Sequence, residues 1–177
     1  MKKILLLALF LGVSIQGFSQ KGMYGIRGGY NISNLNFEEG KSSNIENKHR
    51  NSFYIGCFGD FKLSEKVSIV PELQFSAEGA KDERLHLDYI QAPILFKLKI
   101  SPKIRLAAGP QISLKSYKYE DGVKNFAYSG VGGVEYKLTE MLFIDLRYTL
   151  GMSNIFDEHL ITEAKNTNIQ FGVGYQF

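Results

Sequence analysis

Charged and amide side chains recur along the chain at positions flanked by apolar residues, and some of them could do acid–base chemistry. Glu135 and Asp145 are two such acids, and a pair of carboxylates is what most glycoside hydrolases use. A series of acids and bases could also conduct protons or ions. The recurring positions are Arg27, Asp60, Glu72, Gln74, Gln91, Gln111, Glu135, Asp145, Arg147 and Gln170. Which chemistry applies depends on the elements that hold these residues.

Two other groups of residues give little sign of chemistry. His49, His86 and His159 lie far apart in the sequence, and no two of them have the spacing of a metal site. The glycine-rich run 130–133 superficially resembles a phosphate loop, but no helix follows it and no Lys-Ser/Thr pair completes it. We expect these glycines to relieve crowding where a strand curves.

Side-chain character alternates residue by residue along most of the chain, which is the period of a β-strand with one apolar face. The pattern predicts eight strands, at residues 24–32, 53–63, 67–76, 90–98, 104–114, 126–136, 142–150 and 167–177. Ahead of the fourth strand, Leu85 and Leu87 fall in the opposite phase. We therefore expect a β-bulge near Asp88.

Connections between the predicted strands alternate between short and long. Short turns are expected at 64–66, 101–103 and 139–141, and long loops at 36–51, 78–86, 115–125 and 153–166. Outer-membrane barrels have short periplasmic turns and longer external loops. Aromatic residues also gather near both ends of the apolar faces, as in the belts at membrane interfaces. The periplasmic belt would contain Tyr24, Phe61, Tyr136 and Tyr175, and the external belt Tyr30, Phe53, Phe75, Tyr128 and Tyr148. The sequence thus predicts an all-β fold, an eight-stranded antiparallel up-and-down transmembrane β-barrel.

Both ends of the chain fit export to an outer membrane. Lys2 and Lys3 precede an apolar run that is too short to span a bilayer, and small residues follow it. We expect residues 1–19 to be a signal peptide and residues 20–177 to form the barrel domain. Phe177 closes the last apolar face, as in the closing strand of bacterial outer-membrane barrels, which predicts an assembly signal for the barrel assembly machinery.

Several stretches resemble the PorT-like outer-membrane β-barrel family of Bacteroidetes-type bacteria. They are GIRGGYNISNL at 25–35, VPEL at 70–73, YIQAP at 89–93, AGP at 108–110 and RYTLGMSNI at 147–155. The resemblance implies a barrel in the cell outer membrane. The family name also suggests a share in protein secretion, although its members have no single activity in common.

Composition narrows the possible partners. Without the signal, about 158 residues remain, with a net charge of about +1, so nucleic acid is not an implied partner. Cys57 is the only cysteine, which excludes an internal disulfide, and its phase points it toward lipid. No long apolar stretch follows the signal, so a helical membrane protein is excluded.

The polar faces of such a barrel point into a narrow lumen. Eight strands enclose room only for their own side chains, and a buried unpaired ion costs several kcal/mol. We therefore expect a polar plug of ion pairs and not an ion path or a glycosidase site. The predicted lumenal cluster contains Arg27, Asp60, Glu72, Gln91, Glu135, Asp145 and Arg147. Glu135 and Asp145 should lie nearly opposite each other, and such like charges require a cation such as Arg147 or Arg27 close by.

These features favour a non-enzymatic, monomeric protein without a cofactor, surrounded by outer-membrane lipid and lipopolysaccharide. Its role would be structural, or it would contact an envelope or secretion partner through loops 36–51 and 153–166. One alternative is an enzyme that modifies lipid A, with His159 and Ser153 at the external rim. Another is a soluble lipocalin-like binder, whose apolar face would line a ligand cavity.

Overall fold

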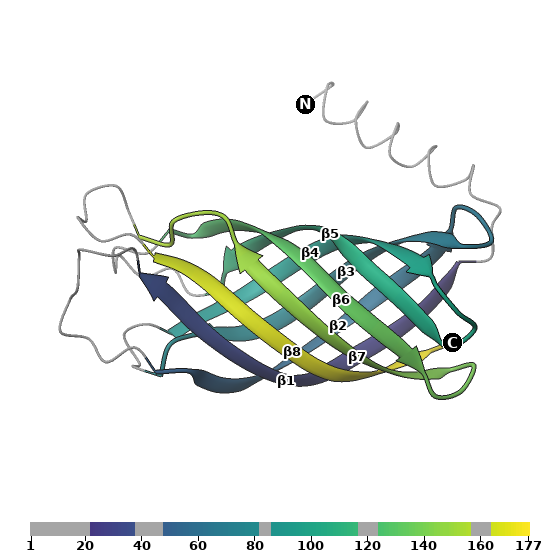
Figure 1. Ribbon diagram of the computed structural model, residues 1–177. Helices are drawn as coiled ribbons and strands as arrows, with labels where there is room; N and C mark the ends of the chain where they lie inside the picture. The colour runs from purple at the N-terminus through teal and green to yellow at the C-terminus, as the bar shows by residue number, and fades with distance from the viewer. Residues whose placement is uncertain (1–21, 38–47, 82–85, 117–123, 157–163) are drawn as a thin grey trace, which may run out of the picture.

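The structure is a computed structural model that describes residues 22–37, 48–81, 86–116, 124–156 and 164–177. Eight strands run through these ranges, each antiparallel to the next, and the last also pairs with the first to close a barrel (Figure 1). They are β1 (Met23–Phe37), β2 (Arg50–Lys62), β3 (Val67–Gly79), β4 (His86–Lys99), β5 (Ile104–Lys115), β6 (Phe126–Lys137), β7 (Leu142–Gly151) and β8 (Ala164–Gln176). The predicted fold class is therefore confirmed. The predicted signal peptide lies outside the described residues.

The three short turns share one local device. In the first turn, the Ser64 hydroxyl oxygen accepts hydrogen bonds from the backbone N–H groups of Lys66 and Val67, at 3.3 and 3.1 Å. Ser101 and Thr139 accept equivalent bonds in the other two turns. Such bonds fix a tight turn without any special backbone angle. All three turns lie at the same end of the barrel as the C-terminus, which makes this the periplasmic end (Figure 1).

The strands differ in length, and the long ones are neighbours. β1 to β4 and β8 contain 13 to 15 residues, whereas a tilted strand crosses a bilayer in about 9 to 11. β5 to β7 contain only 10 to 12 residues. The surplus lies beyond the external aromatic belt, so one side of the barrel extends past the membrane. We call this extension the tall wall, and it comprises residues 33–37, 50–52, 76–79, 86–89 and 164–168.

The outer face of the barrel is apolar, as a lipid-facing surface must be. Of the nine predicted belt aromatics, seven have at least 39% of their surface exposed. The other two pack beside a belt neighbour, Phe61 at 6.0 Å from Tyr24 and Phe75 at 5.9 Å from Phe53 between ring centroids. Cys57 is also exposed on this face, as predicted. The lipocalin-like alternative is wrong, because its apolar face would point inward.

The predicted β-bulge near Asp88 is also wrong. The ladder between β3 and β4 keeps one register past this position, where Asp88 pairs with Ala77. Leu87 is only 1% exposed and points into the barrel with Tyr89, so its phase is regular. The bulge was expected because an inward leucine did not fit a wholly polar lumen. Leu85 lies outside the described residues.

An apolar lid explains the inward leucine. Buried side chains from three separate parts of the chain pack together across the external end of the lumen. The lid consists of Leu35, Ala80, Leu87, Tyr89, Ile155, Phe156 and Ala164. A second buried apolar cluster contains Phe58, Val70, Leu95, Ala107, Val131 and Phe143. The interior is thus built from apolar and polar layers. Within the described ranges, no helix is both long and apolar enough to cross a membrane.

The glycines of β6 have different surroundings. A Cβ atom added at Gly133 would lie 2.6 Å from the carbonyl oxygen of Leu146, so only glycine fits against the neighbouring strand there. At Gly130 and Gly132, an added Cβ would meet nothing within 4 Å. The expectation that glycine relieves crowding in this run therefore holds for Gly133 and is wrong for the other two.

Candidate functional site

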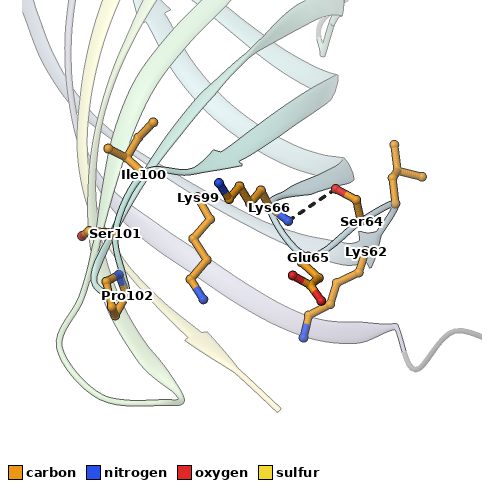
Figure 2. Close-up of a pocket in the computed structure, with 9 residues that line it drawn as sticks. Lys62, Ser64, Glu65, Lys66, Lys99, Ile100, Ser101 and Pro102 are labelled. Atoms are coloured by element: carbon orange, nitrogen blue, oxygen red, sulfur yellow. Dashed lines mark hydrogen bonds between the residues drawn. The ribbon is translucent and has the colours of Figure 1, made fainter.

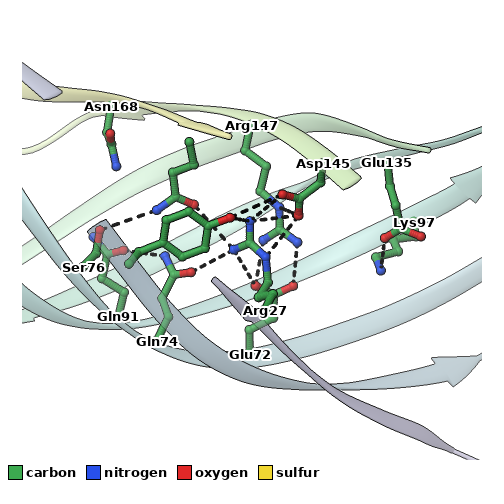
Figure 3. A network of polar contacts seen from close by, with 12 residues as sticks. Arg27, Glu72, Gln74, Ser76, Gln91, Lys97, Glu135, Asp145, Arg147 and Asn168 are labelled. Carbon is green, nitrogen blue, oxygen red and sulfur yellow. Dashed lines mark hydrogen bonds and ion pairs between the residues drawn. The ribbon is translucent and has the colours of Figure 1, made fainter. Parts of the chain in front are cut away.

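The structure places all seven residues of the predicted lumenal cluster inside the barrel, each at most 7% exposed. Period two explains this placement, because alternate residues of every strand face inward. Gln74, Gln111 and Gln170 are buried on the same face. These polar residues contain two ion-pair networks and one group of neutral donors around a carboxylate (Figure 3). Gln74 links one network to that group, because it accepts a hydrogen bond from Arg27 at 2.9 Å and donates one to Gln91 at 2.6 Å.

The first network, which we call the arginine network, joins Arg27, Glu72, Asp145 and Arg147. Arg147 contacts Glu72 with two parallel hydrogen bonds of 2.7 and 2.9 Å between guanidinium nitrogens and carboxylate oxygens. Arg27 pairs with Asp145 at 2.8 Å, and Arg147 also approaches Asp145 at 3.2 Å. Two cations and two anions balance in this network. Bidentate guanidinium–carboxylate contacts of this kind are among the strongest hydrogen bonds in proteins.

Neutral groups complete the coordination of Arg27. Its Nη1 donates to the Gln74 side-chain oxygen at 2.9 Å, and its Nη2 donates to the Tyr54 hydroxyl at 2.8 Å. The guanidinium carbon also lies 4.5 Å from the centre of the Tyr54 ring. Because a buried ion needs every polar contact it can make, these neighbours hold Arg27 in one orientation across the lumen.

The second network, which we call the lysine network, contains Lys97, Glu135, Asp60 and Arg105. Lys97 Nζ lies 2.6 Å from a carboxylate oxygen of Glu135 and 3.7 Å from one of Asp60. Arg105 Nη1 lies 3.2 Å from Glu135 and 3.5 Å from Asp60. This network is also balanced, with two cations and two anions.

The lysine network adds two residues to the predicted lumenal cluster. Glu135 and Asp145 do lie directly opposite each other in the β6–β7 ladder. Arg27 and Arg147 pair with Asp145, whereas Lys97 and Arg105 supply the cations for Glu135. The predicted lumenal cluster contains Glu135 and Asp60 but neither Lys97 nor Arg105. The alternation of β4 contained the signal, since Lys97 follows Gln91 at an even spacing.

The third group surrounds a carboxylate that was expected in a loop. Glu78 belongs to β3 and is 1% exposed. Its oxygens accept hydrogen bonds from Ser76 at 2.7 Å, Gln91 at 2.9 Å, Asn166 at 2.5 Å and Asn168 at 2.9 Å. No described cation lies within 4 Å of this carboxylate. Four neutral donors replace the water that Glu78 loses on burial.

The external half of the lumen offers little room for a substrate or a solute. The cavity beside Glu78, lined also by Gln111, Ser129 and Thr149, has a volume of about 10 Å³. That is roughly the space one water molecule needs. A larger hollow of about 430 Å³ opens at the periplasmic mouth, where Asp60, Lys97 and Arg105 of the lysine network line it. The apolar lid covers the external end, so no open path runs through the described part of the barrel.

The residues proposed for other chemistry are dispersed. Ser153 is held by the Tyr128 backbone, donating to its carbonyl oxygen at 3.5 Å and accepting from its N–H at 3.1 Å. His159 lies outside the described residues. His49 is exposed, and His86 is partly buried. In the part of the chain that the structure describes, no three His, Cys, Asp or Glu side chains are grouped to hold a metal ion.

A closed antiparallel barrel with an apolar exterior and a neutralised interior defines an integral outer-membrane β-barrel. The sequence agrees, since residues 4–177 match the outer membrane protein beta-barrel domain. The chain belongs to this family and is located in the outer membrane. A comparison of the sequence with curated proteins found no match.

Two solved barrels illustrate the likeness in fold. Ail, the attachment invasion locus protein of Yersinia pestis, has a TM-score of 0.57 and 14% identity, covering 89% of this chain and 100% of Ail. Neisserial surface protein A has a TM-score of 0.58 and 12% identity, covering 87% of this chain and 97% of that protein. Ail in complex with the heparin analogue sucrose octasulfate gives a TM-score of 0.52 and 17% identity, covering 89% and 100%. At these identities, the likeness is one of fold alone.

Proposed function

We propose that this protein is a non-enzymatic, monomeric surface-interaction protein that binds a partner through its external end. The observation that carries this proposal is the combination of a filled lumen with the tall wall. The ion-pair networks use the interior charges for structure, so the lumen offers no site for catalysis or transport. The tall wall, in contrast, raises part of the barrel above the membrane surface.

The tall wall is a rigid support for the loops that we expect to bind. Arg50 donates from one guanidinium nitrogen to the backbone oxygen of Glu78 and to the Asp88 carboxylate at 2.9 Å. The Ser33 hydroxyl donates to the backbone oxygen of Gly79 at 2.8 Å. These contacts join β1, β2, β3 and β4 beyond the lipid-facing region. Binding residues are commonly found on loops that a rigid scaffold positions. Loop 36–51 joins two strands of this wall and loop 153–166 leads into a third, and residues 38–47 and 157–163 of these loops lie outside the described ranges.

The comparisons add a class of partner to test. Ail is named for attachment and invasion and has been solved with a heparin analogue. A sulfated polysaccharide is therefore one candidate partner to test for this protein. A link to protein secretion follows from the resemblance to PorT-like sequences, and both that narrower membership and that link remain expectations.

An enzyme acting on lipid A is the less favoured function. It would need Ser153 as part of a reactive site, but the Ser153 hydroxyl is engaged on both sides by the Tyr128 backbone. Replacement of Ser153 by alanine should therefore leave the lipid A species of the cell unchanged. A shift in the mass spectrum of extracted lipid A on this replacement would favour the enzyme.

Shortening the two loops tests the proposal. Residues 38–47 and 157–163 of these loops would each be replaced by a short Gly-Ser connection, which keeps the tall wall and the apolar lid. The matched control would shorten only 117–123, which belongs to the connection between the shorter strands β5 and β6. We expect the double-loop variant to assemble in the outer membrane but to lose the phenotype that the intact protein restores to a deletion strain. The control should restore it. Full complementation by the double-loop variant would contradict the proposal.

A further inference from the structure

The periplasmic end of the barrel carries an excess of positive charge. Residues 62–66, 99–105 and 137–141 form this end. Its charged residues are Lys62, Lys66, Lys99, Lys103, Arg105 and Lys137, opposed by Glu65 and Glu140. Arg105 belongs to the lysine network, and Lys137 lies 3.4 Å from Glu140. Among the described residues, no ion pair involves Lys62, Lys66 or Lys99. Three ammonium groups are therefore available to a ligand.

The sheet itself brings two of these lysines together. Lys66 immediately precedes β3 and Lys99 ends β4, and the Lys99 N–H donates to the Lys66 carbonyl oxygen at 2.8 Å. Like charges on neighbouring positions of paired strands repel each other. Nothing within the described chain relieves this repulsion through an ion pair. A bound anion would do so.

A hollow lies between the β2–β3 and β4–β5 turns where these lysines meet (Figure 2). Its volume is about 690 Å³, within the usual range of small-molecule sites. Lys62, Lys66 and Lys99 line it, and Glu65 is the one acid there. Figure 2 shows Lys99 standing between the two turns, with Lys66 and Lys62 on the side of the first turn. The hollow is therefore a positively charged site open to the periplasmic side.

The rim of the hollow adds an apolar surface. Leu63 and Ile100 line its edge and are 49% and 57% exposed, and Leu98 continues the surface onto the lipid-facing side of β4. A fully soluble anion would gain no binding energy from contact with such an apolar rim. A molecule with an anionic head and apolar chains, lying at the membrane boundary, fits both parts.

We propose that this hollow binds an anionic phospholipid of the periplasmic leaflet. Lys66 and Lys99 contact the headgroup phosphate, with Lys62 beside it, and the acyl chains lie along Leu63, Ile100 and Leu98. This site is at the opposite end from the proposed partner-binding loops, so either proposal can fail without the other.

Native mass spectrometry of the refolded barrel in detergent tests the site. The protein would be titrated with phosphatidylglycerol and with phosphatidylcholine of identical acyl chains. We expect phosphatidylglycerol to bind about 25-fold more tightly, since Lys66 and Lys99 each contribute about fivefold near an anionic headgroup. The double replacement Lys66→Gln with Lys99→Gln should bring the two lipids to similar affinities. The matched control is Lys81→Gln with Lys103→Gln, which removes the same charge outside the hollow and should keep the preference.

Three outcomes would overturn the proposal. One is equal binding of the two lipids by the unchanged protein. Another is equal loss of preference in both double variants, which would reflect overall charge alone. The third outcome comes from a competition experiment. Glycerophosphoglycerol, the deacylated headgroup, is added at the same concentration as phosphatidylglycerol. If it displaces phosphatidylglycerol, the site binds free phosphate esters and the apolar rim has no role. Gel migration of unheated samples checks that every variant is folded.

Discussion

Arg147 forms ion pairs with Glu72 and Asp145 in the lumen. Its removal should destabilise the barrel, because these buried acids lose a counter-ion. We expect Arg147→Ala to lower the free energy of unfolding by about 3 to 5 kcal/mol, because Glu72 loses both of its short bonds. Adding Glu72→Gln should recover part of this loss. Urea titration of the barrel in detergent or lipid measures both effects.

Glu135 provides the control for that experiment. It lies in the lysine network, and among the described residues no cation forms an ion pair with both Glu135 and Glu72. A double-mutant cycle between Arg147→Ala and Glu135→Gln should therefore give a much smaller coupling energy than the cycle with Glu72→Gln. Equal coupling in the two cycles would mean that the two networks act as one.

Gly172 leaves the space that the Tyr54 hydroxyl occupies beside Arg27. A Cβ atom at Gly172 would lie 1.8 Å from that hydroxyl and 3.0 Å from an Asp145 carboxylate oxygen. Gly172→Ala should therefore destabilise the barrel by about 1 to 3 kcal/mol, in the range of other overpacked interiors. Gly132→Ala is the comparison, because nothing lies within 4 Å of an added Cβ there. Similar unfolding midpoints for the two variants would contradict this account.

At the scale of single residues, the sequence predicted which side chains face inward but not which of them pair. Alternation assigns a face to each residue of a strand, since neighbours point to opposite sides. It contains no information on partners across the lumen, and Arg27 and Asp145 are 118 positions apart in the chain. Lys97 is absent from the predicted cluster because the strand at 90–98 was identified by its apolar face alone, and Lys97 lies on the opposite face.

The bounds of single strands were predicted well in the part that crosses the membrane and poorly in the part that extends beyond it. Bilayer thickness imposes apolar alternation only on the membrane-spanning part, and backbone pairing continues beyond it without that requirement. Glu78 was therefore placed in a loop, although it lies in β3. The apolar lid has the same origin, because Leu87 lies in the part of β4 that belongs to the tall wall.

The end of β8 permits a test of the predicted assembly signal. Phe177 is 68% exposed, and its backbone exchanges hydrogen bonds of 2.8 and 3.2 Å with Tyr24. If the aromatic side chain is the signal, Phe177→Ala and deletion of Phe177 should both lower the yield of assembled barrel in cells. Barrels that have already formed should unfold at nearly the wild-type urea concentration in the Phe177→Ala variant. A normal yield for Phe177→Ala with a low yield for the deletion would assign the effect to the backbone bonds.

For the whole molecule, the closed ladder predicts resistance to detergent. Every strand is bonded on both sides, so the barrel has no free edge at which unfolding can begin. Samples left unheated in sodium dodecyl sulfate should migrate differently from boiled samples on a gel. Identical migration, together with recovery in the soluble periplasmic fraction, would contradict the barrel. The architecture was predictable because strand number, turn length and outward apolar faces all follow from local sequence.

The pairing of β1 with β8 also determines when this protein can finish folding. The seam extends from Gly25 opposite Gln176 to Phe37 opposite Ala164, so the first strand waits for the last part of the chain to arrive. Contacts between such distant segments form slowly, because the entropy of closing the whole chain opposes them. Tyr54 lies on β2 beside Arg27, but Asp145 lies on β7 and meets Arg27 only across the closed lumen. The ion pair between Arg27 and Asp145 therefore completes the burial of both charges only when closure succeeds.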